Sequence, residues 1–222
     1  MSDMIKDLSE LRLSYEQDEL LESIVKANPH EQFLDWFNFA LAANLHEPYA
    51  MYLATADAAG HPHVRTVLLR GATEQGYDFY TNYDSQKGLD LAENPFAELL
   101  FYWPSLERQV RIHGVVEKIT EEESTAYYHK RPRDSQIAAH ASTPQSGVIE
   151  SREALQQRFQ DLYDTFENQA ASQTALPKPV FWGGYRLQAT AYEFWQGRPN
   201  RLHDRLHYQN FEGNWVLQRL MP

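Results

Sequence analysis

The sequence predicts a mainly β protein of the α+β class, an antiparallel barrel with helices at its periphery. Short segments with strand periodicity, bounded by turn residues, dominate the chain. The helical segments are inserted between these strands and do not alternate with them strictly, as they would in a parallel βαβ sheet. A chain of 222 residues is long enough to bury a core without disulfides or metals.

An acidic stretch and one amphipathic helix precede the strands. Residues 3–27 are acidic and loosely helical in pattern, and we expect them to form a mobile arm. Phe33, Phe37 and Leu41 recur at the spacing of one helix face and predict a helix over 30–45. Beyond this helix the hydrophobic period changes to that of strands.

The middle of the chain predicts five strands and a short helix. The turn Ala59-Gly60-His61-Pro62 separates the first two strands. The short helix begins at Ser85 and ends before Pro95, because proline cannot continue a helix. The strands are expected at 49–56, 63–70, 77–81, 97–103 and 108–118.

Two helices follow. Thr120 and Glu123 have the spacing of a capping box and open a helix that ends near Arg131, because Pro132 comes next. Residues 151–167 have the strongest amphipathic pattern in the chain.

The C-terminal part returns to strands. Gly183-Gly184 predicts a turn, and strands are expected at 185–195, near 205–210 and at 214–219. The resulting division is a mobile N-terminal arm, 1–28, and one domain, 29–222.

Composition excludes several classes of site. The chain has no cysteine, which rules out disulfides, thiolate catalysis and cysteine-held zinc or iron–sulfur sites. A net charge of −11 disfavours general nucleic-acid binding. No apolar run approaches the ~18 residues of a membrane helix, and no signal peptide is visible. We therefore expect a cytoplasmic protein with neither nucleic-acid nor membrane partners.

Motifs for phosphate or metal binding by other routes are missing. The sequence contains no phosphate loop, no dinucleotide fingerprint and no nucleophile elbow. The pairs His61/His63 and His203/His207 come without a further set of ligands, so we predict no metal site. Any phosphate would have to be bound by side chains.

The segment from Arg201 to Arg205 is the densest cationic feature near the C-terminus. If it is extended, Arg201, His203 and Arg205 face the same way, so two guanidiniums would flank an imidazole. Such a group could bind an anion and transfer a proton. The alternative is a solvated face paired with acidic neighbours, and the residues alone leave both open.

Two further groups could bind phosphate. Tyr127, Arg131 and Ser135 are spaced to share one helix face, although Pro132 interrupts that helix. A regular strand would point Arg65 and Arg70 to opposite faces, so one would need a strand end or a bulge to join the other. Lys87 lies near the start of the short helix, where backbone N–H groups favour anions.

Taken in order along the chain, these segments resemble the pyridoxine/pyridoxamine 5′-phosphate oxidase family. The resemblance implies an FMN-binding split β-barrel of the antiparallel Greek-key type, working as a homodimer with active sites at the interface. It implies oxidation of pyridoxine 5′-phosphate and pyridoxamine 5′-phosphate to pyridoxal 5′-phosphate, with hydride transfer to FMN and then reaction with O₂ to give H₂O₂. The matching stretches are RTVLLR (65–70), FYTN (79–82), ERQVRIHG (107–114), RPRDSQI (131–137), FWGGY (181–185) and EFWQG…NRLHDR (193–205).

The resemblance also implies residue roles. Those matching the catalytic groups are Arg201 and His203, beside the reacting carbon. Those matching substrate contacts are Arg12, Tyr15, Arg70, Tyr127, Arg131 and Ser135, together with the catalytic pair. Those matching FMN contacts are Arg65, Thr66, Val67, Leu68, Leu69, Arg70, Tyr80, Thr81, Gln86, Lys87, Gln109, Gln145, Ser146, Trp195 and Arg205.

The chain departs from the family pattern at a few positions. Arg70 stands where lysine is usual, which keeps the charge but changes the donor geometry. Gln86 stands where arginine is usual, so one expected cation at the cofactor phosphate is missing. Leu13 and Ser14 separate Arg12 from Tyr15 where the pattern is more polar, and the stretch at Thr143-Pro144 is one residue longer.

Two other functions are possible on such a barrel. One is a non-catalytic flavin- or pyridoxal-phosphate-binding protein, and the other is a flavin reductase with a nicotinamide donor. Fold alone cannot separate these functions. The substrate group of Arg70, Tyr127, Arg131, Ser135, Arg201 and His203 favours the oxidase, because neither alternative explains it.

Overall fold

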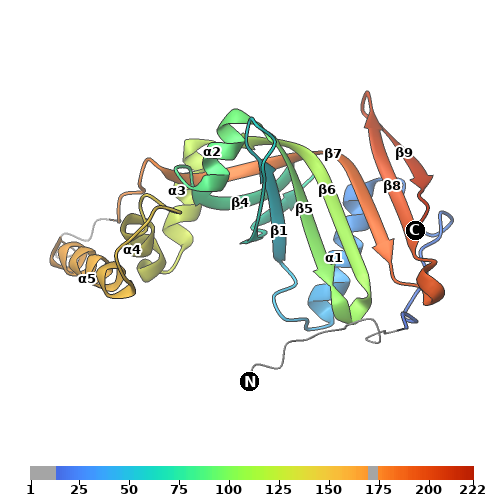
Figure 1. Ribbon diagram of the computed structural model, residues 1–222, viewed down its shortest axis with the longest axis horizontal. Helices are drawn as coiled ribbons and strands as arrows, with labels where there is room; N and C mark the ends of the chain where they lie inside the picture. The colour runs from blue at the N-terminus through green and yellow to red at the C-terminus, as the bar shows by residue number, and fades with distance from the viewer. Residues whose placement is uncertain (1–13, 170–174) are drawn as a thin grey trace, which may run out of the picture. The chain divides into compact units, whose positions relative to one another are not determined.

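The computed structural model describes residues 14–169 and 175–222 (Figure 1). The chain divides into two compact units, which are described separately. The first contains the described residues up to Pro48, with Phe101–Arg111 and Ala191–Pro222; the second contains Tyr49–Leu100 and Ile112–Thr190. Arg12 lies outside the described residues.

In the described part of the chain, nine strands form one sheet, and the pairs β1–β2, β1–β5, β3–β4, β4–β7, β7–β8 and β8–β9 are antiparallel. The order is β2-β1-β5-β6-β7-β4-β3, with β8 pairing both β7 and β9. This confirms the predicted mainly β fold with peripheral helices. The strands are β1 (Ala50–Ala56), β2 (Pro62–Leu68), β3 (Gly71–Thr73), β4 (Gly76–Asn82), β5 (Phe96–Trp103), β6 (Arg108–Lys118), β7 (Trp182–Gln196), β8 (Asp204–Phe211) and β9 (Asn214–Arg219).

In the second unit, β7 contains the two glycines that were expected to form a turn. That prediction is wrong: Gly183 pairs with Thr81 and Gly184 with Tyr80 across β4. A Cβ on Gly183 would collide with the hydroxyl of Tyr83, and one on Gly184 would lie 2.7 Å from the Tyr80 ring. The glycines therefore admit tyrosine rings against the strand.

The second unit contains helices α2 to α5. The predicted capping box of Thr120 and Glu123 is present at the start of α3 (Glu121–Lys130). Pro132 ends that helix, as predicted, but it also serves as the N-cap of α4 (Arg133–Ala141), which the sequence analysis missed. The other helices of this unit are α2 (Gln86–Glu93) and α5 (Arg152–Gln169).

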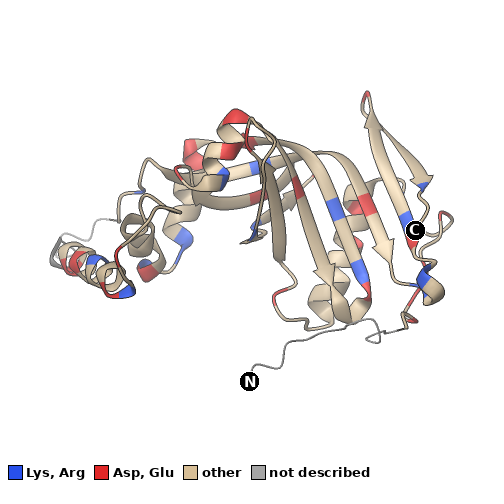
Figure 2. Cartoon of the chain, in the orientation of Figure 1, with Lys and Arg blue, Asp and Glu red and all other residues tan. Residues whose placement is uncertain are grey.

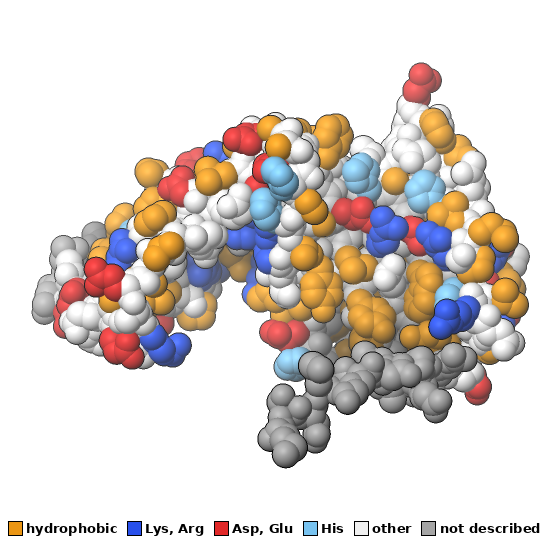
Figure 3. Space-filling view, in the orientation of Figure 1, with side chains coloured by type: hydrophobic (Ala, Val, Ile, Leu, Met, Phe, Trp, Pro, Cys, Tyr) orange, Lys and Arg blue, Asp and Glu red, His pale blue; other side chains and the backbone are white. Residues whose placement is uncertain are grey.

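Helix α5 covers a small hydrophobic core. Its Phe159, Leu162 and Phe166 pack against a buried cluster that includes Tyr128 and Trp182. Large hydrophobic side chains also remain exposed elsewhere in this unit, on β1, β2 and β5, and Figure 3 shows hydrophobic side chains gathered over the strands. None of the helices among the described residues is long and apolar enough to cross a bilayer.

The first unit is built on α1 (Pro29–Ala42) and the β8–β9 hairpin. Asn28 caps α1, and Phe33 is fully buried with its ring 5.0 Å from that of Phe101. The described residues before α1, 14–28, contain no helix, so the loosely helical pattern expected there is wrong. Two 3₁₀ turns, Pro104–Leu106 and Pro199–Arg201, complete the unit.

Candidate functional site

A cavity of about 400 Å³ lies in the second unit, beside the ends of β2 and β4. Most of the cofactor- and substrate-binding residues predicted for this unit line it. The lining comprises Arg65, Thr66, Val67, Leu68, Arg70, Tyr80, Thr81, Asn82, Lys87, Tyr127, Arg131, Ala138, Ala139, Ser142, Gln145 and Trp182.

The charge of this cavity has one sign. Arg65, Arg70, Lys87 and Arg131 line it, and no carboxylate is among the described residues that do so. The chain as a whole carries a net charge of −11, and acidic positions are spread along its helices and strands (Figure 2). Four cations collected against that background favour the binding of an anion.

Arg65 is held at the cavity by groups behind it. Its Nη1 donates to the carbonyl of Leu53 at 3.1 Å and to the hydroxyl of Thr55 at 2.7 Å, and its Nη2 lies 3.8 Å from Asp90. The Asp90 side chain is only 1% exposed and accepts bonds from Thr55, His63 and Gln86. Burial opposes these bonds, yet together they lower the pKa of Asp90.

Among the described residues, the hydrogen-bond acceptors of Lys87 are all neutral. Its Nζ donates to the hydroxyls of Thr81 and Ser85, both at 3.1 Å, and to the side-chain carbonyl of Gln145 at 3.5 Å. Burial, together with the nearby charge of Arg65, lowers the pKa of Lys87 to about 8. A bound anion would stabilise the protonated form of this amine.

Arg70 lies beyond the end of the strand that contains Arg65, so the alternation of side chains along a strand does not separate the two arginines. Strand β2 ends at Leu68, and the backbone N–H of Arg70 donates to the carbonyl of Asp78 at 2.8 Å. The Arg70 guanidinium lies 5.6 Å from the centre of the Tyr49 ring. The strand end, one of the two possibilities raised by the sequence, brings both arginines to the cavity.

An aromatic wall forms another side of the cavity. The rings of Tyr80 and Tyr127 stack at 3.8 Å, and Trp182 stacks beside Tyr80 at 5.6 Å. The guanidinium of Arg131 lies over Trp182, 4.6 Å from the ring centre. This arrangement offers a flat surface and a cation to a ligand with a ring and a phosphate.

Two buried donors of the cavity have no partner within the described chain. They are Nη1 of Arg131 and Nδ2 of Asn82. Because buried polar groups are normally satisfied, each indicates a hydrogen bond to something that is not protein. For Asn82 the amide orientation is fixed, since its Oδ1 accepts the N–H of Asp84 at 2.7 Å.

Four predicted residues of this unit do not line the cavity. The Gln86 side chain donates to Asp90 at 2.9 Å, and its backbone N–H donates to the Ser146 hydroxyl at 3.4 Å. Leu69 is buried in the core at 6% exposure. Ser135 lies in the first turn of α4, beyond the break at Pro132.

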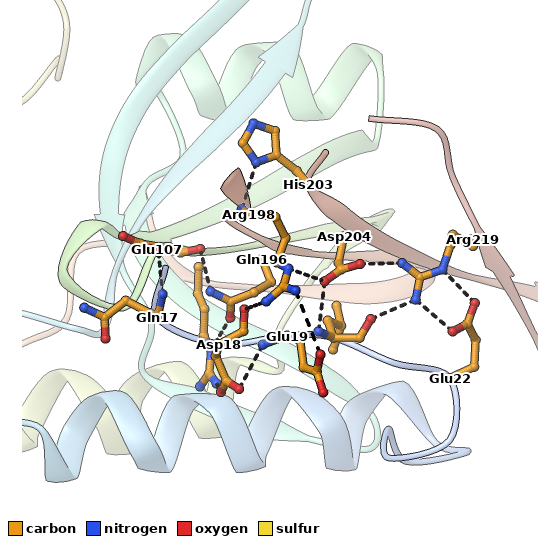
Figure 4. Close-up of polar contacts among 12 residues, drawn as sticks. Gln17, Asp18, Glu19, Glu22, Glu107, Gln196, Arg198, His203, Asp204 and Arg219 are labelled. Carbon is orange, nitrogen blue, oxygen red and sulfur yellow. Dashed lines mark hydrogen bonds and ion pairs between the residues drawn. The ribbon is translucent and has the colours of Figure 1, made fainter. Parts of the chain in front are cut away.

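The first unit contains a second cluster, formed by Tyr15, Trp195 and His203. The ring of His203 lies 4.8 Å from that of Trp195 and 5.6 Å from that of Tyr15. Figure 4 shows Nδ1 of His203 turned toward the backbone N–H of Arg198, from which it accepts a bond at 3.1 Å. Nε2 therefore bears the proton of the neutral ring. Burial, followed by the charge of Arg201, lowers the pKa of His203 and favours that neutral form.

The segment from Arg201 to Arg205 is not extended throughout, so the condition for a common face of Arg201, His203 and Arg205 is not met. Arg201 ends a 3₁₀ turn with φ of 62°, and β8 begins only at Asp204. Non-glycine residues rarely adopt such a φ, and where they do the strain is often found at functional sites.

Arg205 is paired with a carboxylate. It donates from Nε and Nη2 to Glu193 at 2.9 and 3.1 Å. Glu193 is 7% exposed and also accepts a bond from Arg111. The remaining predicted residue of this unit, Gln109, is half-buried in β6.

Sequence reasoning missed Asn82, Asp90, Trp182 and Glu193. Asn82 and Trp182 fall inside the matched stretches FYTN and FWGGY, so their presence there was a usable signal. Glu193 opens the matched stretch EFWQG and had the same signal. Asp90 had none, because its partners Thr55 and His63 are distant in sequence. Among the described residues, no group of three or more histidines and carboxylates could hold a metal ion.

Comparisons with known proteins agree across the chain. A family model described as pyridoxamine 5′-phosphate oxidase matches residues 37–166. A second, described as a pyridoxine 5′-phosphate oxidase C-terminal dimerisation region, matches residues 182–222.

Relatives named pyridoxine/pyridoxamine 5′-phosphate oxidase are similar over nearly the full length. One from Acinetobacter baumannii is 78% identical, covering 100% of both chains. One from Deinococcus deserti is 53% identical, covering 97% of this chain and 99% of the relative.

Solved structures share the fold. PhzG from Burkholderia lata, solved with tetrahydrophenazine-1-carboxylic acid, is 30% identical with a TM-score of 0.83, covering 92% of this chain and 98% of that one. A pyridoxamine 5′-phosphate oxidase-related, FMN-binding protein from Nostoc punctiforme has a TM-score of 0.67 at 17% identity, covering 89% of this chain and 100% of that one.

Proposed function

We propose that the chain, which belongs to the pyridoxine/pyridoxamine 5′-phosphate oxidase family of enzymes, oxidises pyridoxine 5′-phosphate and pyridoxamine 5′-phosphate to pyridoxal 5′-phosphate. The observation that carries the proposal is the cavity with four cations, an aromatic wall and no lining carboxylate among the described residues. A phosphorylated, flat, aromatic ligand matches each of these features.

We propose FMN as the cofactor, and the donor set of the cavity fits its phosphate. Arg65 and Lys87 bring two cations to one side of the cavity, and Lys87 has only neutral acceptors until an anion arrives. The unpartnered Nδ2 of Asn82 is a further donor there. When bound, FMN supplies the hydride acceptor, which O₂ reoxidises with formation of H₂O₂.

Arg70, Tyr127 and Arg131 are the proposed ligands of the substrate phosphate. The buried, unpartnered Nη1 of Arg131 supports this role, because the guanidinium is already aligned over Trp182 before a ligand arrives. Ser135 keeps its proposed role on the matched motif alone.

His203 and Arg201 are proposed to act at the reacting end of the substrate. With Nδ1 accepting the N–H of Arg198, His203 presents Nε2–H as a donor to an oxygen or nitrogen of the ligand. The lowered pKa of His203 keeps the ring neutral near pH 7, so that Arg201 supplies the positive charge. The proton and the charge therefore come from different side chains.

A cytoplasmic homodimer with active sites at its interface completes the proposal. Residues 182–222 match a family model described as a dimerisation region, which supports the dimer. Exposed hydrophobic side chains also support it: Tyr52, Val64 and Phe96 are 44%, 70% and 55% exposed. Such residues usually mark an association surface when they are contiguous.

The decisive experiment is an oxidation assay. The purified protein is examined for a flavin spectrum, pyridoxine 5′-phosphate is added under air, and pyridoxal 5′-phosphate and H₂O₂ are followed. We expect both products in equal amounts. A yellow protein that forms neither product would support the non-catalytic flavin-binding alternative.

A further inference from the structure

Residues 15–22, which we name the strap, follow the surface of the first unit without forming a helix or a strand. Side chains from several distant segments bind it there, as Figure 4 shows. The contacts fall into three groups along the strap: an ion-pair cluster at its C-terminal end, two arginines at its middle and an aromatic contact at its start.

The C-terminal end of the strap is bound by Asp204 and Arg219. Oδ2 of Asp204 accepts the backbone N–H of Leu20 at 3.1 Å, and Arg219 donates to the Leu20 carbonyl at 2.8 Å. Arg219 also donates to Glu22 through two bonds of 2.8 and 2.7 Å and to Oδ1 of Asp204 at 2.6 Å. Leu20 itself is 2% exposed, so both its backbone and its side chain are fixed.

The middle of the strap is bound by Arg108 and Arg198. Nη2 of Arg108 donates to the carboxylate of Asp18 at 2.6 Å, and Arg198 donates to the carbonyl of Asp18 at 2.9 Å. The Arg108 guanidinium lies over Trp36, 4.5 Å from the ring centre. Asp18 is therefore fixed to the body of the unit through both its side chain and its backbone.

At its start, the strap contacts the His203 cluster. The Tyr15 ring meets Trp195 and His203 edge to face, with ring centres 5.8 and 5.6 Å apart. At Gly197 an added Cβ would lie 2.8 Å from the Tyr15 ring, so the glycine gives this ring its space. The position of Tyr15 thus depends on where the rest of the strap is fixed.

From these contacts we propose that Asp204 and Arg219 are positioning residues, whose ion pairs fix the strap so that Tyr15 covers one edge of the His203 imidazole. Asp204 directly follows His203, so the same short segment carries the imidazole and the carboxylate that binds the strap. The side chain of Asp204 is 14% exposed, whereas that of Glu22 is 50% exposed. The Asp204 pair is therefore less screened by water and salt than the Glu22 pair.

The role of Asp204 and Arg219 in fixing the strap can be tested without any catalytic assay. In Arg219→Gln and Asp204→Asn, we expect deuterium exchange to rise at the amides of residues 15–22 and the ring protons of His203 to shift in NMR spectra. The shift should approach that of Tyr15→Leu, because the same ring current is lost. Arg133→Gln is the control: it breaks an ion pair of 2.6 Å made by an arginine that is 39% exposed, against 35% for Arg219. Glu22→Gln changes an exposed side chain and serves if a stronger variant does not fold.

The consequence for turnover rests on the proposed function. We expect Arg219→Gln to raise the KM for pyridoxine 5′-phosphate about three- to tenfold while the Kd for FMN stays unchanged. Unchanged deuterium exchange in the strap would show that Asp204 and Arg219 do not fix it. Increased exchange in the strap with unaltered His203 chemical shifts and an unaltered KM would overturn their positioning role. If the wild type oxidised no substrate, the proposed function would fail, while deuterium exchange and NMR would still test whether Asp204 and Arg219 fix the strap.

Discussion

The substitution Gln86→Arg tests how the missing cation affects the proposed cofactor site. Gln86 is the first residue of α2 and precedes Lys87, but its neutral side chain is bound to Asp90 at 2.9 Å. A charged hydrogen bond contributes about 1.5–3 kcal/mol, which corresponds to about 10- to 140-fold in affinity. Because the buried Asp90 would compete for the new guanidinium, we expect FMN to bind about tenfold more tightly, at the lower end of this range.

The measurement is a titration of FMN into flavin-free protein, followed by the quenching of flavin fluorescence. Gln157→Arg adds the same charge to an exposed position on α5, outside the cavity lining, and is the control. It should bind FMN as the wild type does. Equal affinities of the wild type and Gln86→Arg would refute the reasoning that a cation is missing at this position.

Three more predictions concern binding and turnover. Lys87 must be protonated to bind a phosphate, and its pKa is about 8. The affinity for FMN should therefore fall as pH rises above 8, and Lys87→Met should remove that pH dependence in a titration series. Arg201→Ala should lower kcat about a hundredfold with little loss of FMN, and a variant that lost flavin yet kept its turnover per bound flavin would contradict the assigned role. Trp182→Leu removes the ring beneath Arg131, worth about 0.5–2 kcal/mol, and steady-state assays should give a higher KM for the phosphorylated substrate with unchanged FMN affinity.

Local sequence signals predicted the elements whose causes are local. The capping box at Thr120 and Glu123 needs only residues three apart, and both of its hydrogen bonds are present. Pro132 shows the limit of local signals: the sequence predicts only a helix end there, although a proline can also precede the first turn of a helix. The same residue ends α3 and begins α4.

The candidate site was predictable as a set of residues but not as an arrangement. The cations Arg65, Arg70, Lys87 and Arg131 were all named from sequence, and they line one cavity. The supports behind them could not be found, because Asp90 contacts Thr55 and His63 from 35 and 27 residues away. Tertiary pairing of this kind leaves no periodic signal in the chain.

The collection of four like charges in one cavity also concerns the lifetime of the protein. Without an anionic ligand these cations repel one another, and two buried donors have no partner among the residues that the structure describes. A ligand at 100 times its Kd stabilises the native state by about 2.7 kcal/mol, a large share of the ~5–15 kcal/mol that holds a typical domain folded. The supply of that ligand would then set how much of the newly made chain escapes unfolding and proteolysis in the cell.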